Sequence, residues 1–180
     1  MKWYTGIGSR DTPSDICLMM SSISIYLNKY KYILRSGGAA GADKAFEDTL
    51  LTDIEIYLPW KSFNGSGSEF YLDNITKDTR DDAYKIAKMF YHSNLDSALE
   101  NTRKFMTRNT FQIFGQKVGE LDEISKFVIC WTKDGKDSGG TGQALKIARH
   151  YNVPVYNLKN KEDKADLSNL LLEIKYNGCS

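Results

Sequence analysis

Two glycine-rich segments, each between a strand-like run and a helix-like run, constrain the fold of this 180-residue chain more than any other feature. Their sequences are SGGAAGAD at residues 36–43 and SGGTGQA at residues 138–144. Glycines in such turns let the backbone approach a ligand closely, and free N–H groups at the start of the following helix attract an anion. Glycines that only close a tight turn are the alternative for either segment alone. Because the arrangement occurs twice, we expect two phosphate-binding turns and a nucleotide ligand.

The hydrophobic pattern divides the whole chain into alternating strands and helices. Short apolar runs predict strands at residues 2–7, 32–34, 54–58, 126–131 and 153–156. Apolar residues at helical spacing predict helices at residues 13–30, 42–51, 144–151 and 163–176, and two in series between 79 and 115. Such alternation gives right-handed βαβ units. The sequence therefore predicts an α/β fold, a Rossmann-like three-layer sandwich with a mainly parallel sheet of about five strands, in one domain over residues 1–180.

Several boundaries between these elements carry their own signals. Thr12 is expected to cap the first helix, with Pro13 at its first position. The apolar run 126–131 is typical of an internal parallel strand that is covered on both faces. The polar segment 62–68 predicts a mobile loop without an element, and the charged residues 159–164 predict a solvated linker.

Composition limits the classes of partner that the chain can bind. Lys and Arg total 24 against 23 Asp and Glu, so the net charge is +1 and no bulk positive field recruits nucleic acid or a membrane. An anion site must therefore be local. No apolar run approaches the length of a signal peptide core or a membrane-spanning helix, so we expect a cytoplasmic protein.

Cysteine and histidine do not form a metal-binding pattern. Cys17, Cys130 and Cys179 are odd in number and far apart, which fits neither a disulfide framework nor a zinc cluster. His92 and His150 are remote from each other and have no carboxylate or cysteine at ligand spacing. We therefore expect no metal site and no cofactor.

Four short motifs occur in a characteristic order: GSR at residues 8–10, GGAAGAD at 37–43, YLPW at 57–60 and GGTGQA at 139–144. With these motifs the chain resembles the SLOG superfamily over residues 1–158, and especially its small stand-alone members, several of them encoded by phages. The superfamily includes the lonely-guy phosphoribohydrolases, DNA-processing protein A, and domains that sense cyclic ADP-ribose derivatives in bacterial antiviral systems. The resemblance implies a Rossmann-like nucleotide-binding domain, host cytoplasm for a viral member, and a homo-oligomer. Residues 79–115 are the candidate interface, although an amphipathic stripe there fits packing within the chain equally well.

The resemblance also suggests roles for two arginines. The segment Met106-Thr107-Arg108-Asn109 is similar to the Met-x-Arg-Lys segment of the phosphoribohydrolases, whose arginine reaches the ligand from a helix. Arg108 is therefore a candidate phosphate or ribose contact, with a solvent-facing helix arginine as the alternative. Arg10 lies in the turn after the first strand, where ligand crevices of α/β sheets open.

One departure from the family pattern bears on catalysis. The phosphoribohydrolases have GGxGTxxE, and its glutamate assists cleavage of the N-glycosidic bond, whereas this chain has Gln143 and Lys146 in that stretch. An amide can hydrogen-bond a ligand but does not transfer protons near neutral pH. Asp43, Glu47 or Asp137 could replace the missing acid; Asp43 could equally bind a ribose hydroxyl or cap its helix.

These observations favour a protein that binds a phosphorylated nucleotide-derived ligand and sequesters it, for example a cyclic ADP-ribose immune signal. The alternatives are a nucleotide N-glycosidase and, disfavoured by the balanced charge, a single-stranded DNA-binding protein. An adenine ring could stack on Trp60, Phe63 or Trp131, although each also suits the core. The candidate ligand-binding residues are Gly8, Ser9, Arg10, Ser36, Gly37, Gly38, Asp43, Arg108, Asn109, Gly139, Gly140, Thr141, Gly142 and Gln143.

Overall fold

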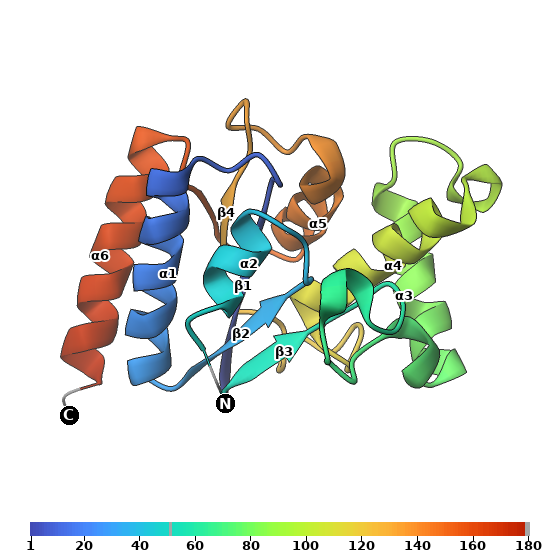
Figure 1. Ribbon diagram of the computed structural model, residues 1–180, viewed down its shortest axis with the longest axis horizontal. Coiled ribbons are helices and arrows are strands. Elements are labelled where there is room, and N and C mark those ends of the chain that lie inside the picture. Colours follow the sequence, from blue (N-terminus) through green and yellow to red (C-terminus); the bar gives the residue numbers. More distant parts are fainter. Residues whose placement is uncertain (51, 179–180) are drawn as a thin grey trace.

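A five-stranded parallel sheet forms the centre of the molecule (Figure 1). The computed structural model describes residues 1–50 and 52–178. The strand order is β3-β2-β1-β4-β5, and every neighbouring pair is parallel. The strands are β1 (Lys2–Gly8), β2 (Tyr32–Ser36), β3 (Ile54–Ile56), β4 (Val128–Trp131) and β5 (Val155–Asn157). The predicted α/β Rossmann-like fold with a parallel sheet is confirmed.

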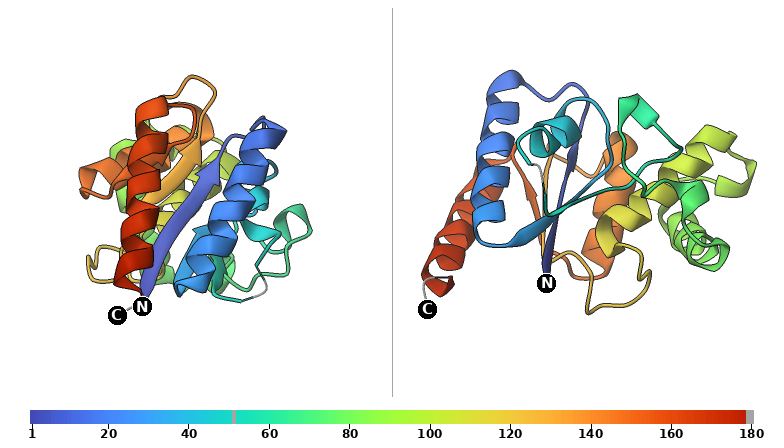
Figure 2. Two further views of the ribbon diagram at one scale, coloured as in Figure 1. Left: turned by 90° about the vertical axis from the view of Figure 1, so that its left-hand side faces the viewer. Right: turned by 60° about the horizontal axis from the view of Figure 1, so that its bottom comes forward.

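Helices cover both faces of the sheet and complete three layers (Figures 1 and 2). One face carries α1 (Ser14–Lys29), α2 (Ala42–Glu47) and α6 (Lys161–Asn177), and α1 and α6 lie side by side. The other face carries α4 (Glu100–Phe114) and α5 (Gly139–His150), and α3 (Lys77–Phe90) packs on the outer side of α4. Three short 3-10 helices lie between β3 and α4: η1 (Phe63–Gly65), η2 (Leu72–Asn74) and η3 (Leu95–Ser97).

Alternating side chains of the strands supply two separate cores. Tyr4, Leu34 and Ile129 point toward the layer of α1, α2 and α6. Val128 and Cys130 point the other way, toward α4 and α5. All residues of β4 are buried, so residues 128–131 of the predicted strand 126–131 form an internal strand covered on both faces, as the apolar sequence predicts, whereas Lys126 precedes the strand and is exposed.

The topology places a crevice at one edge of the sheet. From β1 the chain proceeds through α1, β2 and α2 to β3, with both crossover helices on one face. From β4 it proceeds in the opposite direction to β5, with α5 on the other face. The turns after β1 and β4 therefore diverge at the carboxyl ends of adjacent strands, which is where open α/β sheets bind ligands.

Some element boundaries differ from the sequence-based expectation. Pro13 occupies the cap position of α1, because the Thr12 hydroxyl donates to the Ser9 carbonyl (2.7 Å) and does not cap the helix. Helix α2 ends at Glu47, short of the predicted end at Leu51, a residue that lies outside the described part of the chain. Helix α6 begins at Lys161 and so includes part of the predicted linker.

Two predicted segments are packed differently from the expectation. The segment 62–68 is not a loop without an element: it contains η1, and Phe63 is buried with its ring 5.1 Å from that of Trp60. Leu95 and Leu99, which lie in the stretch 79–115 predicted to form two helices in series, precede α4, and Leu99 is 80% exposed. In α4 the buried residues are instead those of its second half, 107–114.

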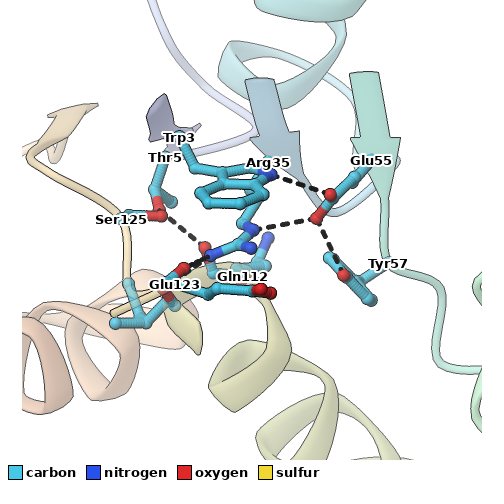
Figure 3. A network of polar contacts seen from close by, with 9 residues as sticks. Trp3, Thr5, Arg35, Glu55, Tyr57, Gln112, Glu123 and Ser125 are labelled. Atoms are coloured by element: carbon cyan, nitrogen blue, oxygen red, sulfur yellow. Dashed lines mark hydrogen bonds and ion pairs between the residues drawn. The ribbon is translucent and has the colours of Figure 1, made fainter. Parts of the chain in front are cut away.

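A buried arginine on β2 fixes the end of α4 on the sheet (Figure 3). The Arg35 Nη1 donates to the carbonyl oxygens of Ile113 (3.3 Å) and Glu123 (2.6 Å), and Nε donates to Glu55 (2.8 Å). The guanidinium also lies 4.7 Å from the centre of the Trp3 ring. Cations favour the carboxyl end of a helix, where carbonyl groups lack helical partners. Arg35 therefore holds α4 in place from the sheet side.

A second contact joins α4 to the first strand in the same network (Figure 3). The Thr5 hydroxyl donates to the carbonyl oxygen of Gln112 (2.6 Å) and lies 2.8 Å from the Ser125 hydroxyl. Both contacts are fully buried, so the register of α4 on the sheet is fixed at its last turn. No helix in the described part of the chain is long and apolar enough to cross a membrane.

Candidate functional site

A cavity of about 530 Å³ opens at the carboxyl edge of the sheet, between the turns after β1 and β4 and the side of α4. This volume lies within the range of about 300–1,000 Å³ that is usual for small-molecule sites. Nine predicted site residues line it: Gly8, Ser9, Arg10, Asp43, Arg108, Asn109, Gly139, Gly140 and Thr141. Segments far apart in the sequence thus meet at one cavity.

The other five predicted residues do not line the cavity. Ser36, Gly37 and Gly38 lie behind the residues that line the cavity, and the Ser36 hydroxyl donates to the Gly6 carbonyl (2.9 Å). Gly142 and Gln143 are buried on α5, at the end of its first turn and just beyond it. These residues can shape the site, but they do not face a ligand in the cavity.

The first glycine-rich turn uses its backbone donors internally. The N–H of Gly38 donates to the Glu47 carboxylate (2.9 Å), and Asp43 accepts from the N–H of Gly8 (3.1 Å). With the Gln112 amide oriented to satisfy its neighbours, its oxygen accepts from the N–H of Gly37 (3.1 Å). The N–H groups of Gly37 and Gly38 are therefore bonded within the protein and are not available to a phosphate. From this segment, Ala39 and Asp43 line the cavity.

Close packing against a distant side chain explains the glycine at position 37. A Cβ atom built on Gly37 would overlap the guanidinium of Arg108. The same Arg108 Nη1 donates to the reoriented Gln112 amide oxygen (2.8 Å). The first glycine-rich segment therefore supports the cavity by leaving room for Arg108.

Arg108 is buried, which excludes the alternative that it is a solvent-facing arginine on the helix surface. Its Nη1 lies 3.7 Å from the Asp43 carboxylate, which is too long for a good hydrogen bond. Its Nε has no hydrogen-bond partner among the residues that the structure describes. A buried donor without a partner is costly, which makes Arg108 the clearest sign that a polar ligand belongs in this cavity.

Burial shifts the protonation of the acids beside Arg108. Desolvation raises the pKa of Asp43 to about 7, although the Arg108 charge acts in the opposite direction. Desolvation also raises the pKa of Glu47. Near neutral pH, Asp43 can therefore gain or lose a proton at the cavity wall, which an ordinary aspartate cannot.

Side-chain amides connect α3, α4 and α5 behind the cavity. The Asn109 amide donates to the Gln143 side-chain oxygen (2.9 Å) and to the Gly140 carbonyl (3.1 Å). The Gln143 amide nitrogen in turn lies near the carbonyl oxygens of Ala87 (3.3 Å) and Met106 (3.4 Å). Asn109 thus fixes the start of α5, and Gln143 joins helices instead of facing a ligand.

Replacing Gln143 with glutamate should destabilise the protein by about 1–3 kcal/mol, because the Ala87 and Met106 carbonyls lose their donor and a carboxyl group faces them in the interior. The free energy of unfolding from urea titrations measures this loss. The exposed Gln116 provides a control, since Gln116→Glu should change stability by less than about 0.5 kcal/mol. Equal stability of the two variants would contradict a structural role for Gln143.

The second glycine-rich segment opens α5 directly at the cavity. Helix α5 begins at Gly139, so the glycines form its first turn and do not precede it. Gly139 and Gly140 are exposed, line the cavity and have open space where a side chain would start. The first N–H groups of an α-helix have no helical partners and carry a partial positive charge. This turn can therefore bind an anion.

Sequence reasoning missed several lining residues, of which Phe105 and Lys133 bear most on ligand chemistry. Phe105 stands one turn before Arg108 and Asn109 on α4, so helical spacing from Arg108 could have indicated it. Lys133 follows β4 directly, at the edge where the crevice opens. The predicted stacking residues are placed elsewhere: Trp131 belongs to the core beside α1 and α6, and Trp60 contacts Phe105 without lining the cavity.

Within residues 1–50 and 52–178, no group of three His, Cys, Asp or Glu side chains is arranged to hold a metal ion. The His150 ring packs edge-on against Phe90 at 5.0 Å. Cys130 is buried and Cys17 half-buried, both as free thiols, and Cys179 lies outside the described residues. Asp137 pairs with Arg149 (2.8 Å) and does not line the cavity, so of the three proposed replacement acids only Asp43 faces it.

Comparisons of the chain with protein-family models, with curated proteins and with solved structures find no match.

Proposed function

We propose that this protein binds a phosphorylated nucleotide-derived ligand in the cavity between β1, β4 and α4, and that it holds the ligand intact. The observation that carries the proposal is Arg108, a buried cation that lines the cavity together with the open first turn of α5, and whose Nε has no hydrogen-bond partner among the described residues. Both features favour a negatively charged oxygen ligand.

The charged side chains that line the cavity favour an anionic ligand. Arg10, Arg108 and Lys133 line it, against Asp11 and Asp43. Since desolvation holds the Asp43 pKa near 7, part of its negative charge is absent at neutral pH. The local balance is therefore positive although the chain as a whole carries only +1.

Retention of the ligand is favoured over turnover because this stretch contains no acid. Lys146 stands where the resembled phosphoribohydrolases have their glutamate, and the Gln143 amide is buried between helices. A protein that sequesters a signal acts through slow release and stoichiometry. We propose a nucleotide immune signal, such as a cyclic ADP-ribose derivative in the host cytoplasm, as the sequestered ligand.

A charge placed on Gly140 tests the proposed anion site. Gly140 is at the second position of α5, and no atom lies near the place that a Cβ would take, so Gly140→Asp and Gly140→Asn should both fold. The aspartate should weaken binding of adenosine monophosphate or cyclic ADP-ribose at least about tenfold relative to asparagine, because it repels the phosphate. Isothermal titration calorimetry measures the affinities.

Stability supplies the control for this pair of variants. An aspartate in the first turn of a helix is favourable by about 0.3–1 kcal/mol, so Gly140→Asp should unfold at no lower temperature than Gly140→Asn. Equal affinities of the two variants would place the phosphate away from α5. If the wild type binds no nucleotide, and the mass spectrum of the purified protein shows none, the proposed nucleotide binding is refuted.

A second candidate function, hydrolysis of a nucleotide N-glycosidic bond, is favoured by one observation. Asp43 lines the cavity beside Arg108 and has a pKa of about 7, which suits proton transfer to a leaving base. The two functions differ in their products. Sequestration returns intact ligand after heating, whereas free base released from excess nucleotide would establish the enzyme.

A further inference from the structure

We propose that Phe105 is the surface on which the ligand's aromatic base stacks, so that the base lies at the Phe105 end of the cavity and the phosphate at the start of α5. This inference rests on the proposed function and assigns the orientation and the recognised chemistry of the same ligand. The expected ligand class is thus a nucleoside phosphate, and not a sugar phosphate or an inorganic anion.

Phe105 is held rigidly by two other aromatic rings. Its centroid lies 5.3 Å from that of Trp60 and 5.5 Å from that of Phe63, in edge-on arrangements of 66° and 76°. Trp60 and Phe63 are themselves edge-on at 5.1 Å. Neither of these two supporting rings lines the cavity, whereas Phe105 does and is only half-buried. A planar ring that two other rings hold in place and that lines the cavity is suited to stack a base.

The surroundings of Phe105 are apolar on the side of the first glycine-rich segment. Ala39 lines the cavity and belongs to the same buried cluster as Phe63, against which Phe105 packs. Met106, next to Phe105 on α4, also lines the cavity and offers a polarizable thioether. These side chains supply apolar contact area that a phosphate cannot use.

The spacing along α4 leaves room for a sugar between the two ends. Phe105 and Asn109 are four residues apart, which corresponds to about 6 Å along a helix axis. The Asn109 amide donates to the Gly140 carbonyl, so Asn109 lies beside the first turn of α5. Arg108 lies between them, with its guanidinium carbon 5.8 Å from the Phe105 ring centre. A base on Phe105 therefore brings its ribose phosphate toward Arg108 and α5.

Two variants of Phe105 and five phosphate compounds test this assignment in the full-length chain. Calorimetric titrations compare ribose 5-phosphate with AMP, GMP, CMP and UMP. For the wild type, at least one of the four nucleotides should bind about tenfold or more tightly than ribose 5-phosphate, as expected from one stacked base. Phe105→Leu should abolish this advantage while the affinity for ribose 5-phosphate stays within about twofold. Phe105→Tyr should retain it.

Phe90→Leu serves as the matched control, because Phe90 is also half-buried but lies on α3 against His150 and away from the cavity. This variant should keep the full preference for a nucleotide. If the wild type binds ribose 5-phosphate as tightly as every nucleotide, or if Phe105→Leu keeps the preference, the stacking assignment is overturned while phosphate binding survives. If the wild type binds none of the five compounds, the stacking assignment is overturned. The proposed function fails as well if the wild type also binds no cyclic ADP-ribose and carries no nucleotide in its mass spectrum.

Discussion

Replacing Arg35 with methionine should lower the free energy of unfolding by about 3–5 kcal/mol, the largest loss expected from a single side chain outside the cavity. The Arg35 side chain is 1% exposed. Its removal leaves the Glu55 carboxylate without its cation and deprives the Ile113 and Glu123 carbonyl oxygens of a donor. Methionine fills similar volume, so the loss reports mainly the broken polar network. Urea unfolding followed by circular dichroism measures it.

An exposed pair on another part of the surface provides the control. Arg80 contacts Asp73 at 3.3 Å and donates to the Leu72 carbonyl (3.0 Å), and its side chain is 31% exposed against 1% for Arg35. Arg80→Met should therefore cost about 1 kcal/mol or less. In addition, Glu55→Gln should recover part of the Arg35→Met loss in the double variant, because it removes the uncompensated charge. Losses of similar size for Arg35→Met and Arg80→Met would show that the network does not stabilise the fold.

The same network connects the stability of the fold to the geometry of the cavity. Thr5 holds the Gln112 backbone, and the Gln112 side chain supports both Arg108 and the Gly37 turn. The last turn of α4 is thus fixed from the sheet, and the cavity wall lies one turn before it. Such support is what keeps a binding residue in one orientation.

The architecture could be predicted from the sequence because it depends on periodicity. Apolar runs such as 126–131 and the helical spacing on α1 reflect which face each element buries, and βαβ alternation permits few topologies. The convergence of the turns at one edge of the sheet follows from the same rule. Arg10 was accordingly predicted at the cavity that it lines, whereas Arg108, which also lines it, was suggested only by the family resemblance of its segment.

The roles of the two glycine-rich segments could not be predicted in the same way, because they depend on partners far along the chain. Position 37 requires a glycine because the Arg108 guanidinium from α4 packs where a Cβ atom would lie. The Gly38 N–H donates to Glu47, at the end of the following helix. A local motif does not reveal which acceptor satisfies a backbone donor. Phe105 was missed for a related reason: its ring becomes a cavity surface only when Trp60 and Phe63 support it from behind.

The protonation of Asp43 gives the second large effect, which depends on pH. An aspartate that titrates near 3.8 in the unfolded chain and near 7 in the folded protein retains its proton longer in the folded state. Its contribution to stability is therefore fully present below about pH 4 and is lost as the pH rises to about 7. The loss reaches about 1.4 kcal/mol per pH unit between these values, or about 4 kcal/mol in total.

Asp43→Asn isolates this contribution, since the amide has the same shape and does not titrate. The difference in unfolding free energy between wild type and Asp43→Asn should decrease steadily from pH 4.5 to pH 7 and remain constant above pH 8. Glu47, whose pKa is also raised by burial, is present in both proteins, so its contribution largely cancels. Urea titrations across this range measure the difference. A difference that is independent of pH would mean that Asp43 stays ionised beside Arg108, and this would remove the proton-transfer argument for the hydrolytic candidate.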